Sequence, residues 1–148
     1  GVDVPQKSNV VLVGGGCGIA GLYLLAKRFS RESNVLTLLA AKDREHIAYL
    51  DEFRKYGEVG VATEDGSLGR KGLVADLMTD LKEGSYFFNC GPRAMINVIL
   101  PLELKVSAPE RIYSSVDYMT RCGVGVCGSC ADEKGRRTCI EGPFVNPE

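Results

Sequence analysis

The sequence contains very little histidine. His46 is the single histidine among 148 residues, and residues 42–45 before it are polar. One histidine excludes two-histidine zinc sites and makes any Ser-His-Asp or Cys-His hydrolase depend on a single side chain. We therefore expect His46 to be an exposed residue in the first turn of a helix, and we expect no side chain to act as a catalytic base or nucleophile.

Long apolar runs and an excess of one charge are also lacking. The 18 Lys and Arg residues nearly balance the 19 Asp and Glu residues, and 45% of the chain is hydrophobic. This composition excludes disorder of the whole chain and argues against general nucleic-acid binding. No run approaches the roughly 18 apolar residues of a membrane span, and residues 1–5 lack signal-peptide features, so we expect a cytoplasmic protein with no membrane partner.

Apolar runs alternate with helical patterns along most of the chain. The runs predict strands at residues 9–13, 35–41, 59–63, 86–89 and 111–116. Apolar spacing predicts helices over residues 19–29, 44–56, 73–81 and around 95–99, where Pro101 should end or kink the last one. This alternation indicates an α/β fold with a five-stranded parallel, Rossmann-like sheet covered on both faces. We predict a nucleotide-binding domain at residues 1–108 and a small lobe at 109–148.

A glycine-rich turn follows the first predicted strand. Gly16, Gly18 and Gly21 fit the pattern G-x-G-x-x-G, and a predicted helix begins at once. Glycines let the backbone approach a phosphate, and the first N–H groups of a helix favour a pyrophosphate. This context predicts a dinucleotide site. The alternative is that the glycines only permit a tight turn and a close contact between helix and sheet.

Charged residues of both signs follow the second predicted strand. An acidic residue at this place normally binds the ribose of NAD, whereas basic residues accommodate the phosphate of NADP. The segment Lys42-Asp43-Arg44 contains both, so NAD and NADP remain open, with Asp43 favouring NAD. Asp43 is equally suited to cap the following helix.

Four cysteines are concentrated in the predicted lobe. Cys122, Cys127, Cys130 and Cys139 have the spacing C-x4-C-x2-C…C of plant-type [2Fe-2S] ligands. The glycines at positions 123, 125 and 128 would let backbone N–H groups approach the sulfides of such a cluster. A structural zinc ion held by the same four thiolates is the alternative. The spacing and the glycines favour the cluster.

Three motifs together resemble the electron-transfer subunits of dihydroorotate dehydrogenase B, which belong to the ferredoxin–NADP reductase superfamily. They are residues 14–20 (GGGCGIA), 89–95 (NCGPRAM) and 122–130 (CGVGVCGSC). The resemblance implies a ferredoxin reductase-type NAD(P) domain, a [2Fe-2S] lobe, and a preceding β-barrel that binds FAD. It also implies a partner: an FMN-containing dihydroorotate dehydrogenase catalytic subunit of pyrimidine biosynthesis, or the related subunit of a sulfhydrogenase or an NADPH-dependent ferredoxin oxidoreductase.

The resemblance also implies roles for individual residues. Cys122, Cys127, Cys130 and Cys139 would ligate iron. The expected cofactor contacts lie at the ends of four predicted strands: Gly15, Gly16, Cys17, Gly18, Ile19, Lys42, Asp43, Glu64, Asp65, Gly66, Cys90, Gly91, Pro92 and Met95. Among them, the glycine turn would meet the pyrophosphate, and the Cys90-Gly91-Pro92 turn would border the nicotinamide. Cys90 has an alternative role as a small buried hydrophobic residue.

The chain departs from the family pattern at its start. Eight residues precede the first predicted strand, so the FAD-binding barrel is missing from this sequence. A minor departure is Gly21, where the family usually has proline or a small residue. Residues 111–114 (RIYS) superficially resemble a flavin motif of the superfamily, but they follow the nucleotide domain, so we interpret them as part of the last strand. We expect the chain to be inactive alone, because FAD needs a domain from elsewhere.

Two functions from different classes follow. In the first, the chain is the oxidoreductase module that connects NAD(P)H and FAD to a partner through a [2Fe-2S] cluster. The cofactors would supply the redox chemistry, and the protein would supply placement and electrostatics. In the second, the chain is a nucleotide-responsive binding protein with a structural four-cysteine zinc site and no redox turnover.

Overall fold

The computed structural model describes residues 2–115 and 119–146. In this part of the chain, strands and helices alternate along most of the sequence. The strands are β1 (Asn9–Gly15), β2 (Asn34–Ala41), β3 (Glu58–Thr63), β4 (Arg70–Lys71), β5 (Tyr86–Cys90) and β6 (Ile112–Ser115). The α-helices are α1 (Ile19–Phe29), α2 (Leu50–Arg54), α3 (Arg93–Glu103) and α4 (Thr138–Glu141), and 3-10 turns cover Gly16–Gly18, Arg44–His46, Val74–Leu77 and Pro109–Arg111.

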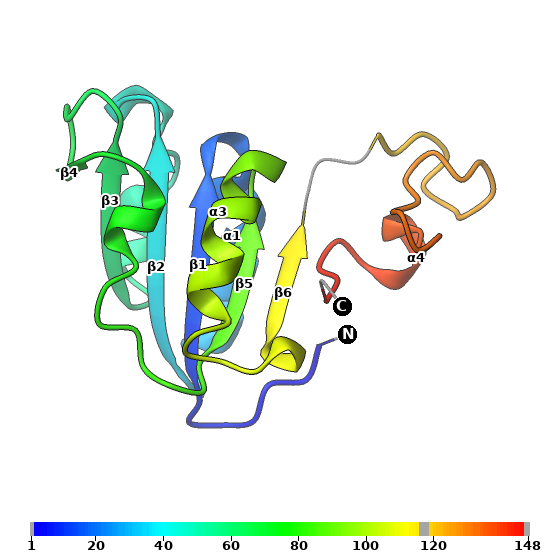
Figure 1. The fold of residues 1–148 in the computed structure, drawn as a ribbon, viewed down its shortest axis with the longest axis horizontal. Helices are drawn as coiled ribbons and strands as arrows, with labels where there is room; N and C mark the ends of the chain where they lie inside the picture. The colour runs from blue at the N-terminus through cyan, green and yellow to red at the C-terminus, as the bar shows by residue number, and fades with distance from the viewer. Residues whose placement is uncertain (1, 116–118, 147–148) are drawn as a thin grey trace.

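The strands form one sheet in the order β4-β3-β2-β1-β5-β6, and every neighbouring pair is parallel (Figure 1). The predicted α/β class and parallel sheet are confirmed, but the predicted number of five strands is wrong. The additional strand, β4, is two residues long and pairs with Ala62 and Thr63 of β3. A two-residue pairing is too short to give a hydrophobic period. Val116, the last residue of the predicted fifth strand, lies outside the described residues.

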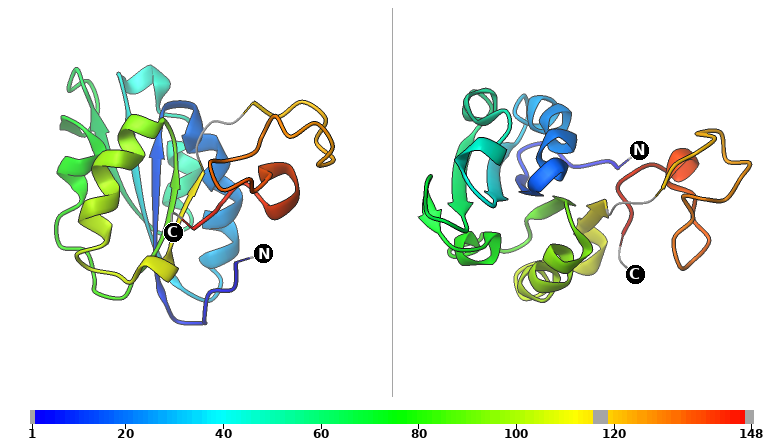
Figure 2. Two further views of the ribbon diagram at one scale, coloured as in Figure 1. Left: turned by 45° about the vertical axis from the view of Figure 1, so that its right-hand side comes forward. Right: turned by 90° about the horizontal axis from the view of Figure 1, so that it is seen from above.

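Apolar side chains cover both faces of the sheet. One cluster joins Leu12 and Phe88 of the sheet to Leu22 of α1 and Phe53 of α2. The other joins the opposite face to α3 and to the 3-10 turn at Val74–Leu77. Figure 2 shows α1 and α3 on opposite sides of the sheet. The continuous apolar strands predicted this two-sided burial.

Two predicted helices are interrupted. The segment 44–56 begins with a 3-10 turn, and α2 starts only after Tyr49, whose φ of 58° is left-handed. The segment 73–81 contains one 3-10 turn, because the Asp76 carboxylate accepts from the backbone N–H of Leu73 at 2.8 Å and closes a tight loop. In contrast, α3 continues two residues beyond Pro101 to Glu103.

Residues 144–146 pack beside β6 (Figures 1 and 2). Ser114 of β6 and Val145 exchange two backbone hydrogen bonds, of 2.8 and 3.1 Å, as an antiparallel bridge. The ring of Phe144 meets the ring of Phe88 edge to face at 5.8 Å. The side-chain amide of Asn146 donates to the carbonyl oxygen of Pro109 at 2.6 Å. These contacts attach residues 119–146, which contain the four cysteines and are called the cysteine segment below, to the sheet.

Within the described ranges, no helix combines the length and the apolar composition that a membrane crossing requires.

Candidate functional site

The glycine turn lies where β1 passes into α1. Gly16 has a φ of 54°, and apart from its own chain neighbours no heavy atom of the described structure lies within 4 Å of the position that its Cβ would take. No side chain caps the amino end of α1, and no acidic residue lies in its first turn. The turn therefore leaves the positive end of the helix dipole uncompensated beside an open backbone, which suits an anion.

The other glycines of the turn make close contacts with the next loop. A Cβ on Gly18 would overlap the carbonyl group of Cys90, and a Cβ on Gly15 would overlap the sulfur of Met95. Gly21 faces the thiol of Cys90, which would lie 3.1 Å from an added Cβ. These glycines thus have the packing role that the sequence left as an alternative. Gly16 lacks such a packing reason.

The close packing joins two turns at the point where the strand order reverses. The chain leaves β1 toward β2 on one side and later adds β5 on the other side of β1. Open α/β sheets bind ligands in the crevice at the carboxyl ends of the strands at such a point. Here α3 begins directly after Cys90-Gly91-Pro92, and its amino end also lacks a capping side chain and an acidic first turn. The turns that lead into α1 and α3 therefore meet at this point, and neither helix has an acidic residue in its first turn.

A cavity of about 400 Å³ lies at this edge of the sheet. Six of the predicted cofactor residues line it: Gly15, Gly16, Lys42, Glu64, Pro92 and Met95. The rest of its wall is apolar and comes from residues the sequence did not single out, among them Ala40, Ala41, Leu73, Val74, Ala94, Val98 and Ile99. Leu73 and Val98 are largely exposed. Apart from Ala94, which belongs to the motif at residues 89–95, no motif marked these side chains, because apolar residues at helical spacing predict core packing equally well.

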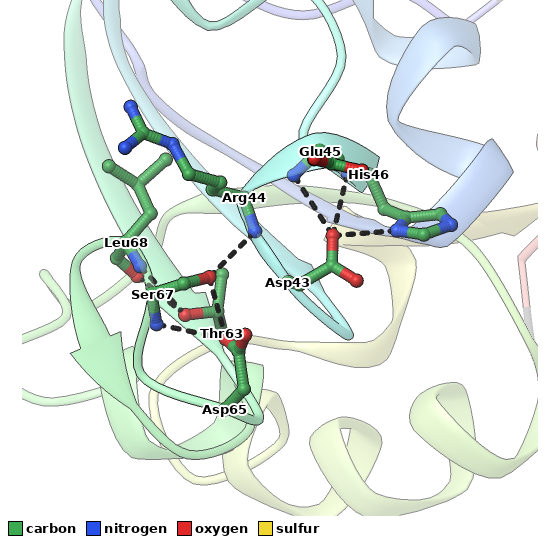
Figure 3. A network of polar contacts seen from close by, with 8 residues as sticks. All are labelled: Asp43, Arg44, Glu45, His46, Thr63, Asp65, Ser67 and Leu68. Carbon is green, nitrogen blue, oxygen red and sulfur yellow. Dashed lines mark hydrogen bonds and ion pairs between the residues drawn. The ribbon is translucent and has the colours of Figure 1, made fainter.

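The loops after β2 and β3 are tied together by polar contacts (Figure 3). The Ser67 hydroxyl accepts from the backbone N–H of Arg44 at 2.9 Å and donates to the Asp65 carboxylate at 2.7 Å. The Thr63 side chain bonds both the N–H and the carbonyl oxygen of Leu68. Asp65 thus stabilises its own turn, and its bonds to Ser67 lower the pKa of its carboxyl. Gly66 has the positive φ of 78° that this turn requires.

Asp43 acts as a helix cap in this network. One of its oxygens accepts from the backbone N–H groups of Glu45 and His46, at 2.9 and 3.2 Å, and meets Nδ1 of His46 at 2.7 Å (Figure 3). The contact with His46 lowers the pKa of the Asp43 carboxyl. Asp43 therefore has the capping role that the sequence left open. The side chain of His46 is 64% exposed, which confirms its expected exposure.

A second hollow, of about 470 Å³, lies at the opposite edge of the sheet. It is lined by residues at the amino ends of β1, β2 and β3, such as Asn9, Asn34 and Glu58. None of the predicted cofactor residues lines it. The six predicted cofactor residues that line a cavity therefore all lie at the carboxyl edge of the sheet.

The four cysteines of the C-terminal segment form two pairs. The backbone N–H of Cys127 approaches the sulfur of Cys122 at 3.5 Å, and the side chains of Cys130 and Cys139 are hydrogen-bond partners. Among residues 2–115 and 119–146, no three His, Cys, Asp or Glu side chains lie close enough to hold a metal ion together. A four-sulfur site would therefore require the two pairs to approach each other.

Backbone N–H groups point at these sulfurs. The N–H groups of Cys127 and Val124 lower the pKa of the Cys122 thiol to about 6, and the N–H of Gly125 bonds to the sulfur of Cys139. Gly123 and Gly125 adopt positive φ angles of 70° and 75°, which turn the loop around the thiols. Backbone N–H donors at the sulfurs of Cys122, Cys130 and Cys139 are of the kind that stabilises the charge of an anionic iron–sulfur cluster.

Two arginines brace the cysteine segment. Arg137 donates to the carbonyl oxygen of Gly125 at 2.7 Å. Arg136 forms an ion pair of 2.6 Å with Asp132 and donates to the carbonyl oxygen of Asn146 at 2.9 Å. Glu133 reaches Arg93 at the start of α3 at 3.1 Å. The segment is therefore connected both to its own end and to the loop beside the crevice.

Curated proteins resemble this chain over nearly its whole length. A probable dihydroorotate dehydrogenase B (NAD(+)) electron transfer subunit from Methanocella arvoryzae is 36% identical over 95% of this chain and 56% of its own length. The corresponding subunit from Listeria welshimeri is 34% identical over 97% and 58%. The chain thus spans little more than half the length of the curated relatives it matches. No protein-family model matches the chain.

Solved structures share the fold. The structure of an NADH-dependent reduced ferredoxin–NADP oxidoreductase matches with a TM-score of 0.81 and 29% identity, over 97% of this chain and 54% of the other. A flavohemoglobin from Malassezia yamatoensis with bound FAD and heme matches with a TM-score of 0.60 at 19% identity, over 77% and 33%, which shows the fold alone. The chain therefore has a ferredoxin reductase-type α/β fold and is similar to part of the dihydroorotate dehydrogenase B electron transfer subunits.

Proposed function

We propose that this chain is the part of an electron-transfer subunit that binds NAD(P) at the carboxyl edge of the sheet and a [2Fe-2S] cluster at its four C-terminal cysteines. One observation carries the proposal. The glycine turn after β1 and the Cys90-Gly91-Pro92 turn after β5 pack against each other at the reversal of strand order, beside a cavity of about 400 Å³. The similarity to electron transfer subunits supports the same function.

The residues of the crevice have complementary roles toward a dinucleotide. The backbone of Gly16 and the amino end of α1 would bind the pyrophosphate, because that helix end carries no compensating acid. The apolar wall, with Leu73 and Val98 exposed, offers flat contact to a base. The turn before α3 would border the nicotinamide. Lys42 lines the cavity while the Asp43 carboxylate caps its own loop, so both NAD and NADP are candidates.

The cysteine segment would hold the cluster. Cys122, Cys127, Cys130 and Cys139 supply four thiolates, and the loop around Gly125 directs N–H groups at the sulfurs. When bound, a [2Fe-2S] cluster exchanges single electrons. The chain's own contribution would be to attach this segment to β6, for which the Ser114–Val145 bridge is the support.

The intact assembly has further parts in this proposal. FAD would bind mainly to a β-barrel domain outside this sequence, and the chain would be inactive without it. The electron acceptor or donor would be an FMN-containing dihydroorotate dehydrogenase catalytic subunit, or a related oxidoreductase subunit, in the cytoplasm. The nucleotide domain would comprise residues 1–108 and the cluster lobe residues 109–148, of which Gly1 and residues 116–118 and 147–148 lie outside the described part.

A structural zinc ion is the second candidate for the cysteines. The observation in its favour is their arrangement as two pairs, since structural zinc is commonly held by four thiolates contributed as pairs. The chain would then be a nucleotide-responsive binding protein without redox turnover.

Anaerobic purification followed by metal and sulfide analysis separates the two candidates. The proposal predicts about two irons and two acid-labile sulfides per chain and a colour that dithionite bleaches. Cys127→Ser should remove the metal and the colour. Cys17→Ser is the matched control, because it removes a thiol outside the cysteine segment, and it should retain the metal. One zinc per chain with no sulfide would instead establish the second candidate.

A further inference from the structure

A carboxyl group is buried in the apolar layer between α3 and the sheet. Glu103, the last residue of α3, has 0% exposed surface. It lies on the same helix face as Ile96 and Ile99, which belong to one of the two apolar clusters. An isolated carboxylate in such surroundings is strongly unfavourable, so its partners decide its charge state.

The partners of Glu103 are neutral. Its Oε2 accepts from the side-chain amide of Asn89 at 2.9 Å, and the same Nδ2 approaches the Ser114 hydroxyl at 3.2 Å. Asn89 is fully buried and Ser114 nearly so. Among the described residues, no charged side chain contributes to the ionisation of Glu103. The other buried side chains of α3, β5 and β6 on this face, Ile96, Ile99, Phe87 and Ile112, are apolar.

Two oxygens in this group have no hydrogen-bond partner within the described structure. They are Oε1 of Glu103 and Oδ1 of Asn89. They belong to the two groups already joined by the bond from Nδ2 to Oε2. A carboxylic acid and a primary amide are complementary, since one hydrogen bond runs from amide N–H to acid oxygen and the other from acid O–H to amide oxygen. A single proton on Oε1 would provide the donor that both orphaned oxygens lack.

We propose that, below neutral pH, Glu103 is held as a neutral carboxylic acid that donates to the side-chain oxygen of Asn89, and that this acid–amide pair positions the turn beginning at Cys90. The second half of the proposal rests on the proposed function. Asn89 is the residue directly before that turn, whose Cys90 carbonyl packs against Gly18. Ser114, whose hydroxyl also accepts from Asn89, forms the backbone bridge to Val145. The buried pair thus connects α3 to the two strands that border the crevice and the cysteine segment.

The ionisation behaviour of the site agrees with the geometry. Burial raises the pKa of Glu103 from its ordinary 4.5 to about 7, and the hydrogen bond from Asn89 opposes this only in part. The group is therefore mostly protonated at slightly acidic pH and loses its proton near neutrality.

Infrared spectroscopy tests the protonation directly. The variants are Glu103→Gln, which keeps one donor and one acceptor, and the control Glu110→Gln, which removes an exposed carboxyl. At about pH 6, where ordinary carboxyls are ionised, wild type and Glu110→Gln should show a protonated-carboxyl stretch that Glu103→Gln lacks. This band should disappear as the pH rises through about 7. Identical wild-type and Glu103→Gln spectra in this region would overturn the proposal.

NADH titration by calorimetry tests the positioning role. Glu103→Leu fills the space but forms no hydrogen bond, so it should weaken NADH binding about tenfold, whereas Glu103→Gln should retain wild-type affinity. Equal affinity in all three proteins would overturn the positioning role. If wild type binds no NADH, the proposed function fails. The amide exchange of residues 90 and 91 then serves as the readout, and it should accelerate in Glu103→Leu and be restored in Glu103→Gln.

Discussion

The buried Glu103 carboxyl should make the free energy of unfolding depend on pH. In the unfolded chain its pKa returns to about its ordinary 4.5, whereas in the folded protein burial raises it to about 7. Because the folded state holds the proton more tightly, the contribution of this group to stability is fully present below about pH 4.5 and is lost as the pH rises through about 7. At about 1.4 kcal/mol per pKa unit, the loss amounts to about 3 kcal/mol.

Urea unfolding of wild type and Glu103→Gln across this pH range measures the loss. At about pH 5 the two proteins should have similar free energies of unfolding, because both then carry a neutral side chain that bonds to Asn89. By about pH 8.5, Glu103→Gln should be more stable than wild type by up to about 3 kcal/mol. Glu110→Gln, which alters an exposed carboxyl, should show no such divergence. A wild type that gains stability relative to Glu103→Gln as the pH rises would contradict the raised pKa of Glu103, because it would mean that the carboxylate form is the stabilising one.

Three further substitutions probe the contacts that build the site. Gly18→Ala should lower the free energy of unfolding by about 1–3 kcal/mol, because its Cβ would overlap the Cys90 carbonyl; unchanged urea unfolding would contradict this contact. Phe144→Ala should remove about 1 kcal/mol of aromatic packing on Phe88 and speed proteolysis within residues 119–146, and equal cleavage rates would argue against this attachment. Ser67→Ala should lower the free energy of unfolding by about 0.5–1.5 kcal/mol, because the hydroxyl's bonds to Asp65 and to the Arg44 N–H are lost. Thermal unfolding measures this, and a stabilised variant would contradict the network.

The strands were predictable because they are buried on both sides. Residues 9–13 and 35–41 are continuous apolar runs, and they form the centre of the sheet in β1 and β2. The covering helices α1 and α3 were also predictable from their apolar spacing. The two-residue β4 was not predictable, because its pairing with Ala62 and Thr63 of β3 is too short to show in a side-chain pattern.

The interrupted helices show why apolar spacing alone was insufficient. Val74, Leu77, Met78 and Leu81 pack in the cluster on the α3 face, as the helical spacing predicted, although only Val74–Leu77 form a 3-10 turn. The same side chains reach the core from a loop that Asp76 closes. In the segment 44–56, the cap at Asp43 and the left-handed Tyr49 divide the expected helix. Local polar bonds therefore determine the backbone conformation of these segments, whereas the hydrophobic pattern determines only which side chains are buried.

The candidate site was predictable where backbone groups form it. The glycine turn and the Cys90-Gly91-Pro92 turn could be identified because glycine permits backbone angles that other residues avoid, whereas proline fixes φ. The apolar wall formed by Leu73 and Val98 could not, because nothing in their identity separates a cavity wall from a core. The acid–amide pair was equally hidden, since Asn89 and Glu103 are brought together only by the fold.

Amide hydrogen exchange can locate the NADH site directly. NADH should slow exchange at residues 15–19 and 93–95, which form the glycine turn and the start of α3. Peptides covering Asn9, Asn34 and Glu58 at the opposite edge should be unaffected. Protection confined to that opposite edge, or the same exchange with and without saturating NADH, would contradict a dinucleotide site at the carboxyl ends of β1 and β5.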